Sequence, residues 1–248
     1  MLDEKSKRAS AQKTLLDKNG GMFSKYKTIF TGNISFLTFM KYEFITMFIN
    51  PMPGALGLFL RKLFLKGLFK KTGKGVIFGR NITIRHPKKI EIGDNVIFDE
   101  NCVIDAKGEE NKGIKIDNNV FIGRNTILSC KEGDIEIGEY SNIGANCYLI
   151  SETKLYLGKY VFVAGNSYMV AGGNHSYEDK NTPMMFQPSK SKGGIIIEDD
   201  VWIGASCTII DGIKIEKGSI VGASSLVNRD IPSYSIAVGT PAKVIKKR

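Results

Sequence analysis

His175 is the side chain of this sequence best suited to move a proton at neutral pH, and it is one of only two histidines in 248 residues. It lies in a polar stretch, residues 172–194, that interrupts an otherwise repeating pattern. An imidazole in such a loop can take a proton from a hydroxyl group and pass it on to a leaving group. The alternative is a surface loop whose histidine takes no part in chemistry. A general base is usually oriented by a second group, and Glu178 and Asp179 are the nearest acidic candidates.

The other residues that could bind a metal or act as nucleophiles do not have the spacing of a site. Catalytic zinc takes three protein ligands, and the second histidine, His86, belongs to an Arg-His-Pro corner far from the first. The cysteines form no C-x-x-C pair, so we expect small buried thiols in a reducing cytosol rather than disulfides or a metal site. These cysteines are Cys102, Cys130, Cys147 and Cys207.

A six-residue period runs through the part of the chain that must position His175. Residues 197–232 divide into hexads that open on an aliphatic residue and carry a small or aliphatic fifth residue. Neither a helix nor a lone strand has this period, whereas a chain that forms a short strand, turns a corner and repeats does. Related coil openings recur from Ile90 onwards. We therefore predict an all-β fold, a parallel β-helix of about seven coils over residues 76–232, with residues 172–194 as its largest insertion.

Residues 1–75 differ from the rest of the chain in composition. The first ~28 residues are polar and rich in lysine, and we expect them to be loosely ordered. Residues 29–71 are apolar and aromatic, and we predict two or three helices there that cap the open end of the first coil. No run free of charge and proline reaches the ~18 residues of a membrane-spanning helix.

The net charge of +10 comes from one block of the chain. No acidic residue lies between Glu43 and Glu91, where there are ten lysines and arginines. Two interpretations of the N-terminal helices remain open: a cap alone, or a cap that also makes peripheral contact with an anionic membrane surface. The N-terminus lacks the apolar core of a signal peptide, so we expect a cytoplasmic protein, with the inner membrane as the surface in the second interpretation. We expect no nucleic-acid partner.

Several motifs go beyond what a β-helix alone requires. They are Asn174-His-Ser in the long insertion, Asp200-Val-Trp-Ile-Gly-Ala, Val221-Gly-Ala-Ser-Ser-Leu-Val, and Val238-Gly-Thr-Pro-Ala-Lys-Val near the C-terminus. Through these motifs, residues 78–248 resemble the hexapeptide-repeat acyltransferases, whose fold is a left-handed β-helix. More narrowly, they resemble the bacterial O-acetyltransferases of sugars and polysaccharides. The resemblance implies an acetyl-CoA-dependent acyltransferase with His175 as general base and no metal.

The resemblance also implies a homotrimer, with acetyl-CoA in the groove between neighbouring β-helices and a saccharide as acceptor. Asn174 and Trp202 are carried over as acceptor-binding residues, although Trp202 is equally well interpreted as an outward-facing position covered by the long insertion. Asn228 stands where the family usually has Thr. The implied cofactor contacts are Gly204, Ala205, Gly222, Ala223, Asn228, Arg229, Lys243 and Lys246, the last two in a C-terminal tail, residues 233–248.

The acceptor itself stays open. The first expectation is transfer to a saccharide hydroxyl, on a surface polysaccharide or a lipid-linked oligosaccharide precursor. The second is transfer to an amine, on a nucleotide-linked amino sugar or a drug such as a streptogramin, because the same histidine serves both. The third is a non-catalytic scaffold anchored by its N-terminal helices. A nucleotidyltransferase is not expected, since no Gly-rich nucleotide-binding motif precedes the β-helix.

Overall fold

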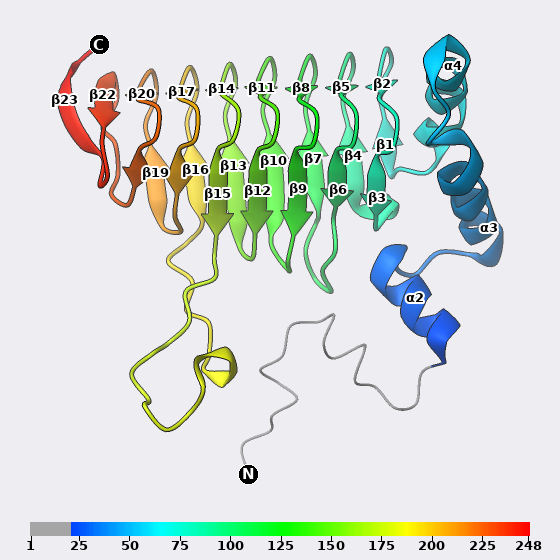
Figure 1. Ribbon diagram of the computed structural model, residues 1–248, viewed down its shortest axis with the longest axis horizontal. Coiled ribbons are helices and arrows are strands. Elements are labelled where there is room, and N and C mark those ends of the chain that lie inside the picture. The colour runs from blue at the N-terminus through cyan, green and yellow to red at the C-terminus, as the bar shows by residue number, and fades with distance from the viewer. Residues whose placement is uncertain (1–20) are drawn as a thin grey trace.

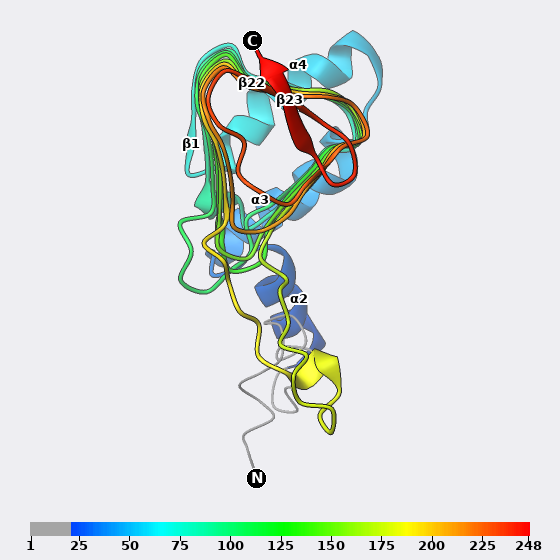
Figure 2. The ribbon, with the colours of Figure 1, turned by 90° about the vertical axis from the view of Figure 1, so that its left-hand side faces the viewer.

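The chain folds as a three-sided, left-handed parallel β-helix with helices at its N-terminal end (Figure 1). The computed structural model describes residues 21–248, so most of the predicted polar tail lies outside the described residues. Figure 2 looks along the axis and shows the coils superimposed as a triangle. The predicted fold class is confirmed.

Each coil adds one short strand to each of three sheets, called sheets A, B and C here. Sheet A contains β1 (Lys71–Thr72), β4 (Ile90–Ile92), β7 (Ile114–Ile116), β10 (Asp134–Ile137), β13 (Lys154–Leu157), β16 (Ile195–Ile197) and β19 (Ile213–Ile215). Sheet B contains β2 (Ile77–Phe78), β5 (Ile97–Phe98), β8 (Phe121–Ile122), β11 (Asn142–Ile143), β14 (Phe162–Val163), β17 (Trp202–Ile203), β20 (Ile220–Val221), β22 (Ser235–Val238) and β23 (Lys243–Lys247). Sheet C contains β3 (Thr83–Arg85), β6 (Val103–Asp105), β9 (Ile127–Cys130), β12 (Tyr148–Ser151), β15 (Tyr168–Ala171), β18 (Thr208–Ile209) and β21 (Leu226–Val227).

The β-helix extends beyond the predicted limits at both ends. Seven coils are complete, and the first strand starts at Lys71 rather than at residue 76. At the other end, β22 continues sheet B inside the predicted tail, and β23 turns back antiparallel to β22. A terminal coil stacks on a neighbour on one side only, so its sequence is less constrained to the hexad pattern.

The corners depend on residues with positive φ, and asparagine provides several of them. Asn101, Asn125 and Asn146 have φ of 59°, 58° and 57°. Asparagine adopts this left-handed conformation more readily than most residues with a side chain. Asn101 Nδ2 donates to Asn125 Oδ1 (3.3 Å), and Asn125 Nδ2 donates to Asn146 Oδ1 (2.9 Å). The same residues therefore form the corners and join successive coils.

The interior is filled by one layer of side chains per coil. Hexad-opening residues such as Ile203 and Ile209 are fully buried, and so are small fifth-position residues such as Cys207 and Ser219. All the cysteines are buried and unpaired, as predicted. Large residues fill the first coils, where the rings of Phe78 and Phe98 stack with centroids 5.6 Å apart.

Helices cover the first coil. They are α2 (Met22–Phe30), α3 (Phe36–Phe44), the π-helical turn η1 (Ile45–Ile49), α4 (Gly54–Phe64) and the 3-10 turn η2 (Leu65–Gly67), while η3 (Pro87–Lys89) and η4 (Met184–Phe186) lie further along. Asn50 makes two hydrogen bonds that a preceding coil would otherwise make. Its Nδ2 donates to the Ile82 carbonyl (2.8 Å), and its Oδ1 accepts from the Ile82 amide (3.0 Å). Tyr42 Oη donates to the Ile84 carbonyl (2.7 Å). These contacts satisfy backbone groups that no preceding strand can reach. Within residues 21–248, no helix has the length and apolar character to cross a membrane.

Candidate functional site

His175 lies on a short antiparallel stem at the base of residues 172–194, called the long loop here. The long loop leaves β15 of sheet C and returns to β16 of sheet A, so it projects from the corner between these sheets (Figure 1). His175 pairs with Ser189 across the stem, and the Ser176 amide donates to the Pro188 carbonyl (2.9 Å). The stem holds the imidazole in a solvent-exposed position.

The imidazole is oriented by a backbone carbonyl. His175 Nδ1 lies 3.4 Å from the carbonyl oxygen of Gln187. A carbonyl oxygen only accepts hydrogen bonds, so this contact assigns the proton to Nδ1 and leaves Nε2 with a free lone pair. Gln187 is buried, and its Nε2 donates to the carbonyls of Asp179 (2.7 Å) and Thr182 (2.9 Å). Gln187 thus ties the tip of the long loop to the stem.

The group at Nδ1 is therefore not the carboxylate that the sequence suggested. Glu178 is turned toward Lys190 Nζ (3.4 Å) and accepts from the Tyr177 amide (3.1 Å). Hydrogen bonds from backbone amides, followed by the Lys190 ammonium, lower the pKa of the Glu178 carboxyl. Asp179 contributes its backbone carbonyl to the Gln187 contact.

A buried carboxylate joins the two ends of the long loop. Asp211 is 3% exposed and follows β18 in the next coil. Its Oδ2 accepts from Asn174 Nδ2 (2.7 Å) and from the Lys192 amide (2.7 Å), and its Oδ1 accepts from the Gly194 amide (2.9 Å). Asn174 precedes His175 on the outgoing strand, whereas Lys192 and Gly194 lie on the returning one. Asp211 consequently fixes the stem against the β-helix.

The predicted acceptor residue Asn174 is thus beside His175, with its side-chain amide directed to a carboxylate. Trp202 lies elsewhere, on the outer face of sheet B, and is 51% exposed. Trp202 therefore faces outward, as the second interpretation expected, but within one chain the long loop leaves the opposite edge of the prism and does not cover it (Figure 1).

The predicted cofactor residues at the Gly-Ala corners lie between sheets B and C. Within residues 21–248, the backbone amides of Ala205 and Ala223 donate to no backbone carbonyl. Gly204 and Gly222 are needed for another reason. A Cβ on Gly204 would lie 2.5 Å from the Ala223 nitrogen, and one on Gly222 would lie 2.6 Å from Val238 Cγ1. Stacking of successive coils therefore requires Gly204, where the clash would be with backbone, whereas at Gly222 it would be with the Val238 side chain.

The other predicted cofactor residues lie on different elements. Asn228 and Arg229 are exposed at the corner between sheets C and A, on the same edge as the long loop. Lys243 and Lys246 are exposed on β23, paired to the end of sheet B. Within one chain, the width of sheet C separates His175 from the Gly-Ala corners (Figure 2).

Known proteins with similar sequences identify the family. The family model described as bacterial transferase hexapeptide (six repeats) matches residues 194–229. A chloramphenicol acetyltransferase of Klebsiella aerogenes is 31% identical over 156 residues, which cover 52% of this chain and 74% of that protein. The chain belongs to the hexapeptide-repeat acyltransferase family. The resemblance to this family that the sequence indicated is confirmed.

One similar protein is much longer than this chain. A probable acetyltransferase of Mycobacterium tuberculosis is 31% identical over 129 residues, 52% of this chain but only 42% of that protein. The chain therefore spans less than half the length of this relative. Among solved structures, AntD, an N-acyltransferase from Bacillus cereus in complex with dTDP and 3-hydroxybutyryl-CoA, matches with a TM-score of 0.51 and 26% identity. That match covers 74% of this chain and 86% of AntD.

Sequence reasoning missed the residues that orient the imidazole in this member of the family. Asp211 begins an Asp-Gly pair, a turn signal that could have drawn attention to it. Gln187 contacts the His175 ring through its backbone carbonyl oxygen, and such a contact cannot be predicted from the residue type.

Proposed function

We propose that this chain is an acetyl-CoA-dependent O-acetyltransferase that transfers an acetyl group to a hydroxyl of a saccharide, with His175 as general base. One observation carries the proposal. The imidazole is exposed on a hydrogen-bonded stem with Nδ1 facing the Gln187 carbonyl, so that Nε2 is free to take a proton.

The reaction follows from these groups. Acetyl-CoA, as the donor substrate, supplies an activated thioester. His175 Nε2 removes the proton of the acceptor hydroxyl as its oxygen forms a bond to the thioester carbonyl carbon. A backbone amide at a Gly-Ala corner, such as that of Ala223, can donate to the oxyanion of the tetrahedral intermediate. The carbon–sulfur bond then breaks, and the imidazolium returns its proton to the leaving thiolate.

The residues proposed to hold the donor have suitable chemistry. The backbone amides of Ala205 and Ala223 suit the amide-containing arm of CoA. The exposed side chains of Arg229, Lys243 and Lys246 suit its phosphates. Asn228, in place of the usual Thr, would meet the donor through an amide rather than a hydroxyl.

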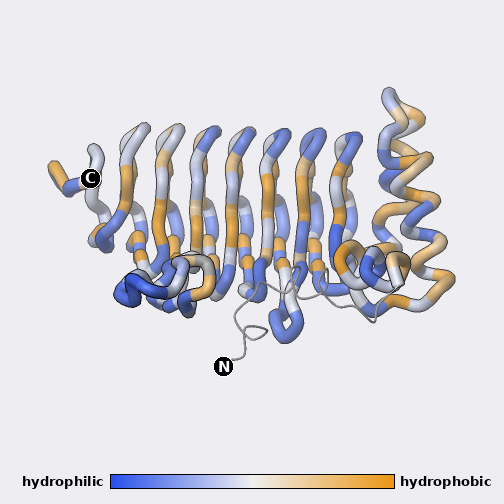
Figure 3. Tube along the Cα trace, turned by 60° about the horizontal axis from the view of Figure 1, so that its bottom comes forward, coloured by the Kyte–Doolittle hydropathy of each residue, from blue (hydrophilic) through white to orange (hydrophobic). Residues whose placement is uncertain are grey.

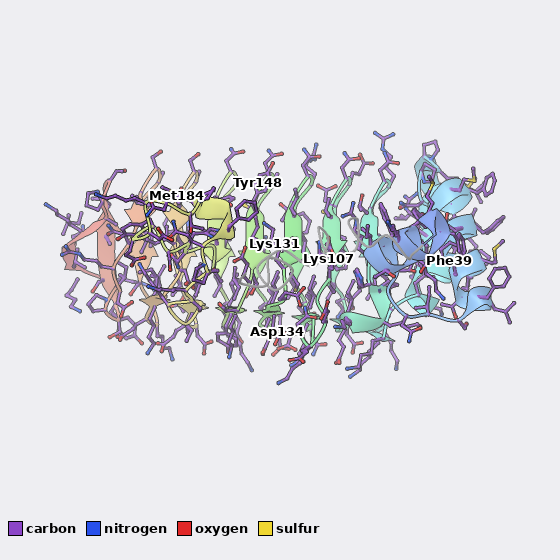
Figure 4. The ribbon with its side chains drawn as sticks, turned by 90° about the horizontal axis from the view of Figure 1, so that it is seen from below. Phe39, Lys107, Lys131, Asp134, Tyr148 and Met184 are labelled. Atoms are coloured by element: carbon purple, nitrogen blue, oxygen red, sulfur yellow. The ribbon has the colours of Figure 1, made fainter. Side chains whose placement is uncertain are left out.

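We propose a homotrimer in which two copies form each site. The outer face of sheet A carries ion pairs such as Lys70–Glu91 (2.7 Å), which suit solvent. Sheets B and C instead expose aromatic side chains, including Phe162 (46%), Trp202 (51%) and Tyr148 (43%, labelled in Figure 4). Such residues are enriched at protein interfaces. Packing through sheets B and C would bring the long loop of one copy to the Gly-Ala corners of the next.

The proposed acceptor is a saccharide hydroxyl of a surface polysaccharide or a lipid-linked precursor, reached from the cytoplasm. Unpaired buried thiols support a reducing compartment. A second candidate is supported by AntD, which is named as an N-acyltransferase and is also solved with dTDP-4-amino-4,6-dideoxyglucose and coenzyme A, at a TM-score of 0.52. A nucleotide-linked amino sugar is therefore the alternative acceptor, using the same base.

A thiol-release assay tests the proposal. Purified wild type, His175→Ala and Lys180→Ala receive acetyl-CoA with free sugars, nucleotide sugars, amino sugars and polysaccharide fragments. We expect acceptor-dependent CoA release by wild type and by Lys180→Ala, an exposed control in the same loop, and a loss of ~10²–10⁴ in His175→Ala. Equal rates in His175→Ala and wild type would remove the imidazole from the mechanism. The acceptor that is consumed decides between hydroxyl and amine.

A further inference from the structure

Helix α4 is amphipathic, but its apolar face points to solvent and its one buried charged residue faces the β-helix, the reverse of an ordinary surface helix. Arg61 faces the β-helix and is only 4% exposed, where its Nε donates to the Phe78 carbonyl (2.9 Å). Burial lowers the pKa of this guanidinium. Leu56 and Phe59 are each 62% exposed, and Leu63 is 47% exposed. These three residues have the i, i+3, i+7 spacing of one helix face, and that face points away from the β-helix.

The helical segment before α4, residues 36–49, also exposes an apolar face on the side away from the β-helix. Tyr42, which bonds to the first coil, is buried, and so are Ile45 and Ile49 on the same side. The opposite side exposes a continuous apolar stripe. Its members are Leu37 (81%), Met40 (51%), Phe44 (55%), Met47 (70%) and Phe48 (55%).

The two apolar stripes are together called the cap face here: Leu37, Met40, Phe44, Met47, Phe48, Leu56, Phe59 and Leu63. Both helical segments contact the first coil through their buried sides, so their exposed sides face the end of the prism (Figure 1). Figure 3 shows the run of hydrophobic segments along the helices at this end. An exposed apolar surface of this extent marks an interaction site rather than a solvated surface.

The charge around the cap face is mainly positive, although Glu43 lies on α3. Lys41, Lys62 and Lys66 are exposed on its helices, and Lys71 and Lys74 follow directly. The nearest acidic side chains in sequence are already engaged, since Glu43 accepts from Tyr26 (2.8 Å) and Glu91 pairs with Lys70 (2.7 Å). The apolar surface is thus fringed by lysines without a competing carboxylate between residues 44 and 90.

We propose that the cap face docks onto an anionic lipid membrane, with the axis of the β-helix upright on the surface. Apolar side chains enter the interface while the lysines meet anionic headgroups, and this combination is what an interfacial helix requires. Docking of a single copy does not depend on the proposed function. In the trimer proposed above, however, cyclic symmetry would point all the cap faces to the same side, so that three weak contacts act together.

A vesicle co-sedimentation experiment with the full chain tests this inference. We expect binding to vesicles of phosphatidylcholine mixed with phosphatidylglycerol, weak binding to pure phosphatidylcholine, and loss of binding at high salt. Lys62→Gln combined with Lys66→Gln should weaken binding about tenfold or more. The matched charge control, Lys131→Gln with Lys217→Gln, removes two exposed lysines from the β-helix and should bind like wild type.

Apolar contacts are tested in the same way. Leu56→Ser combined with Phe59→Ser should abolish binding, whereas Tyr140→Ser with Tyr160→Ser, which removes aromatic residues of 52% and 57% exposure elsewhere, should not. Melting curves confirm that each variant is folded. Equal binding of all variants would overturn the inference, and so would a failure of the wild type to bind either vesicle. Self-association through the cap face without vesicle binding would assign this surface to a second copy instead. The rate at which the cap-face variants acetylate a soluble acceptor is measured separately. Loss of vesicle binding with an unchanged rate tests the docking surface alone, whereas absence of acetylation in the wild type bears only on the proposed function.

Discussion

At the scale of single residues, the cysteines are structural and chemically silent. Each occupies a position inside the β-helix and has no disulfide partner. Burial raises the pKa of the Cys102 thiol to about 12, and it also raises the pKa of Cys147 and Cys207. A raised pKa favours the neutral thiol, which is not the nucleophilic form. These residues therefore fill space, and the candidate chemistry stays with His175.

This assignment predicts that the native protein resists thiol reagents. At pH 8, the pKa of Cys102 leaves a thiolate fraction about 10³-fold below that of a free cysteine, so modification by dithionitrobenzoate should be slower by at least that factor. Absorbance of the released thionitrobenzoate measures the rate. The same protein in urea should react at all the cysteines. Rapid modification of folded protein would show that the interior opens far more readily than its packing implies.

At the scale of elements, two corner insertions, residues 107–113 and 172–194, are closed in the same way, by an aspartate of the next coil that accepts hydrogen bonds from backbone amides. Only the second insertion contains His175. Asp134 Oδ1 accepts from the amides of Lys112 (2.7 Å) and Gly113 (2.9 Å), just as Asp211 accepts from amides at the end of the long loop. Figure 4 views this edge and labels Lys107 and Asp134 at the first insertion and Met184 in the second. Asp211 differs in one respect, because it also holds Asn174 beside the imidazole.

The comparison predicts a separation of stability from activity. Asp211→Ala and Asp134→Ala should each cost about 1–3 kcal/mol of stability, since both leave backbone donors unsatisfied. Only Asp211→Ala should lower kcat, by about tenfold or more. Asp211 holds Asn174 beside His175, and a displacement of the base by about 1 Å is enough to impair catalysis. Asp211→Asn keeps one acceptor oxygen and should recover part of the loss. Thermal melting and steady-state kinetics measure the two effects, and equal kcat values in the two Ala variants would exclude a positioning role for Asp211.

Periodicity was sufficient to predict the β-helix, because every coil repeats the same aliphatic and small positions from Ile90 to Ile231. The contacts of the candidate site were not predictable in the same way. Asp211 meets Asn174 only because one coil stacks on the next, and Gln187 acts through a backbone oxygen. Proximity in sequence favoured Glu178 and Asp179. The Glu178 carboxylate instead bonds within its own turn and to Lys190, and the Asp179 carboxylate accepts from the Asn181 amide. Arg61, counted in the basic block, is buried under the cap. Composition reveals charge but not the direction in which a side chain points.

At the scale of the whole molecule, one chain holds two halves of the proposed site on different edges. The long loop projects between sheets C and A, whereas Ala205 and Ala223 lie between sheets B and C (Figure 2). In a ring of three copies, each copy can offer its long loop to one neighbour and its Gly-Ala corners to the other. Neither half is then sufficient without the adjacent chain.

A shared site predicts complementation between two inactive variants. His175→Ala lacks the base but keeps the corner, while Ala223→Trp keeps the base and fills the exposed corner with an indole. Each should be inactive alone. Equal amounts of the two variants are unfolded and refolded together. A site between two neighbouring copies is active when the intact histidine comes from one variant and the intact corner from the other. Random assembly of a cyclic trimer gives this combination at about one site in four. We therefore expect about a quarter of the wild-type CoA release from the mixture, and none when the two folded proteins are mixed without exchange. A refolded mixture that stays inactive, although it contains mixed trimers by native mass spectrometry, would mean that base and donor meet within a single chain.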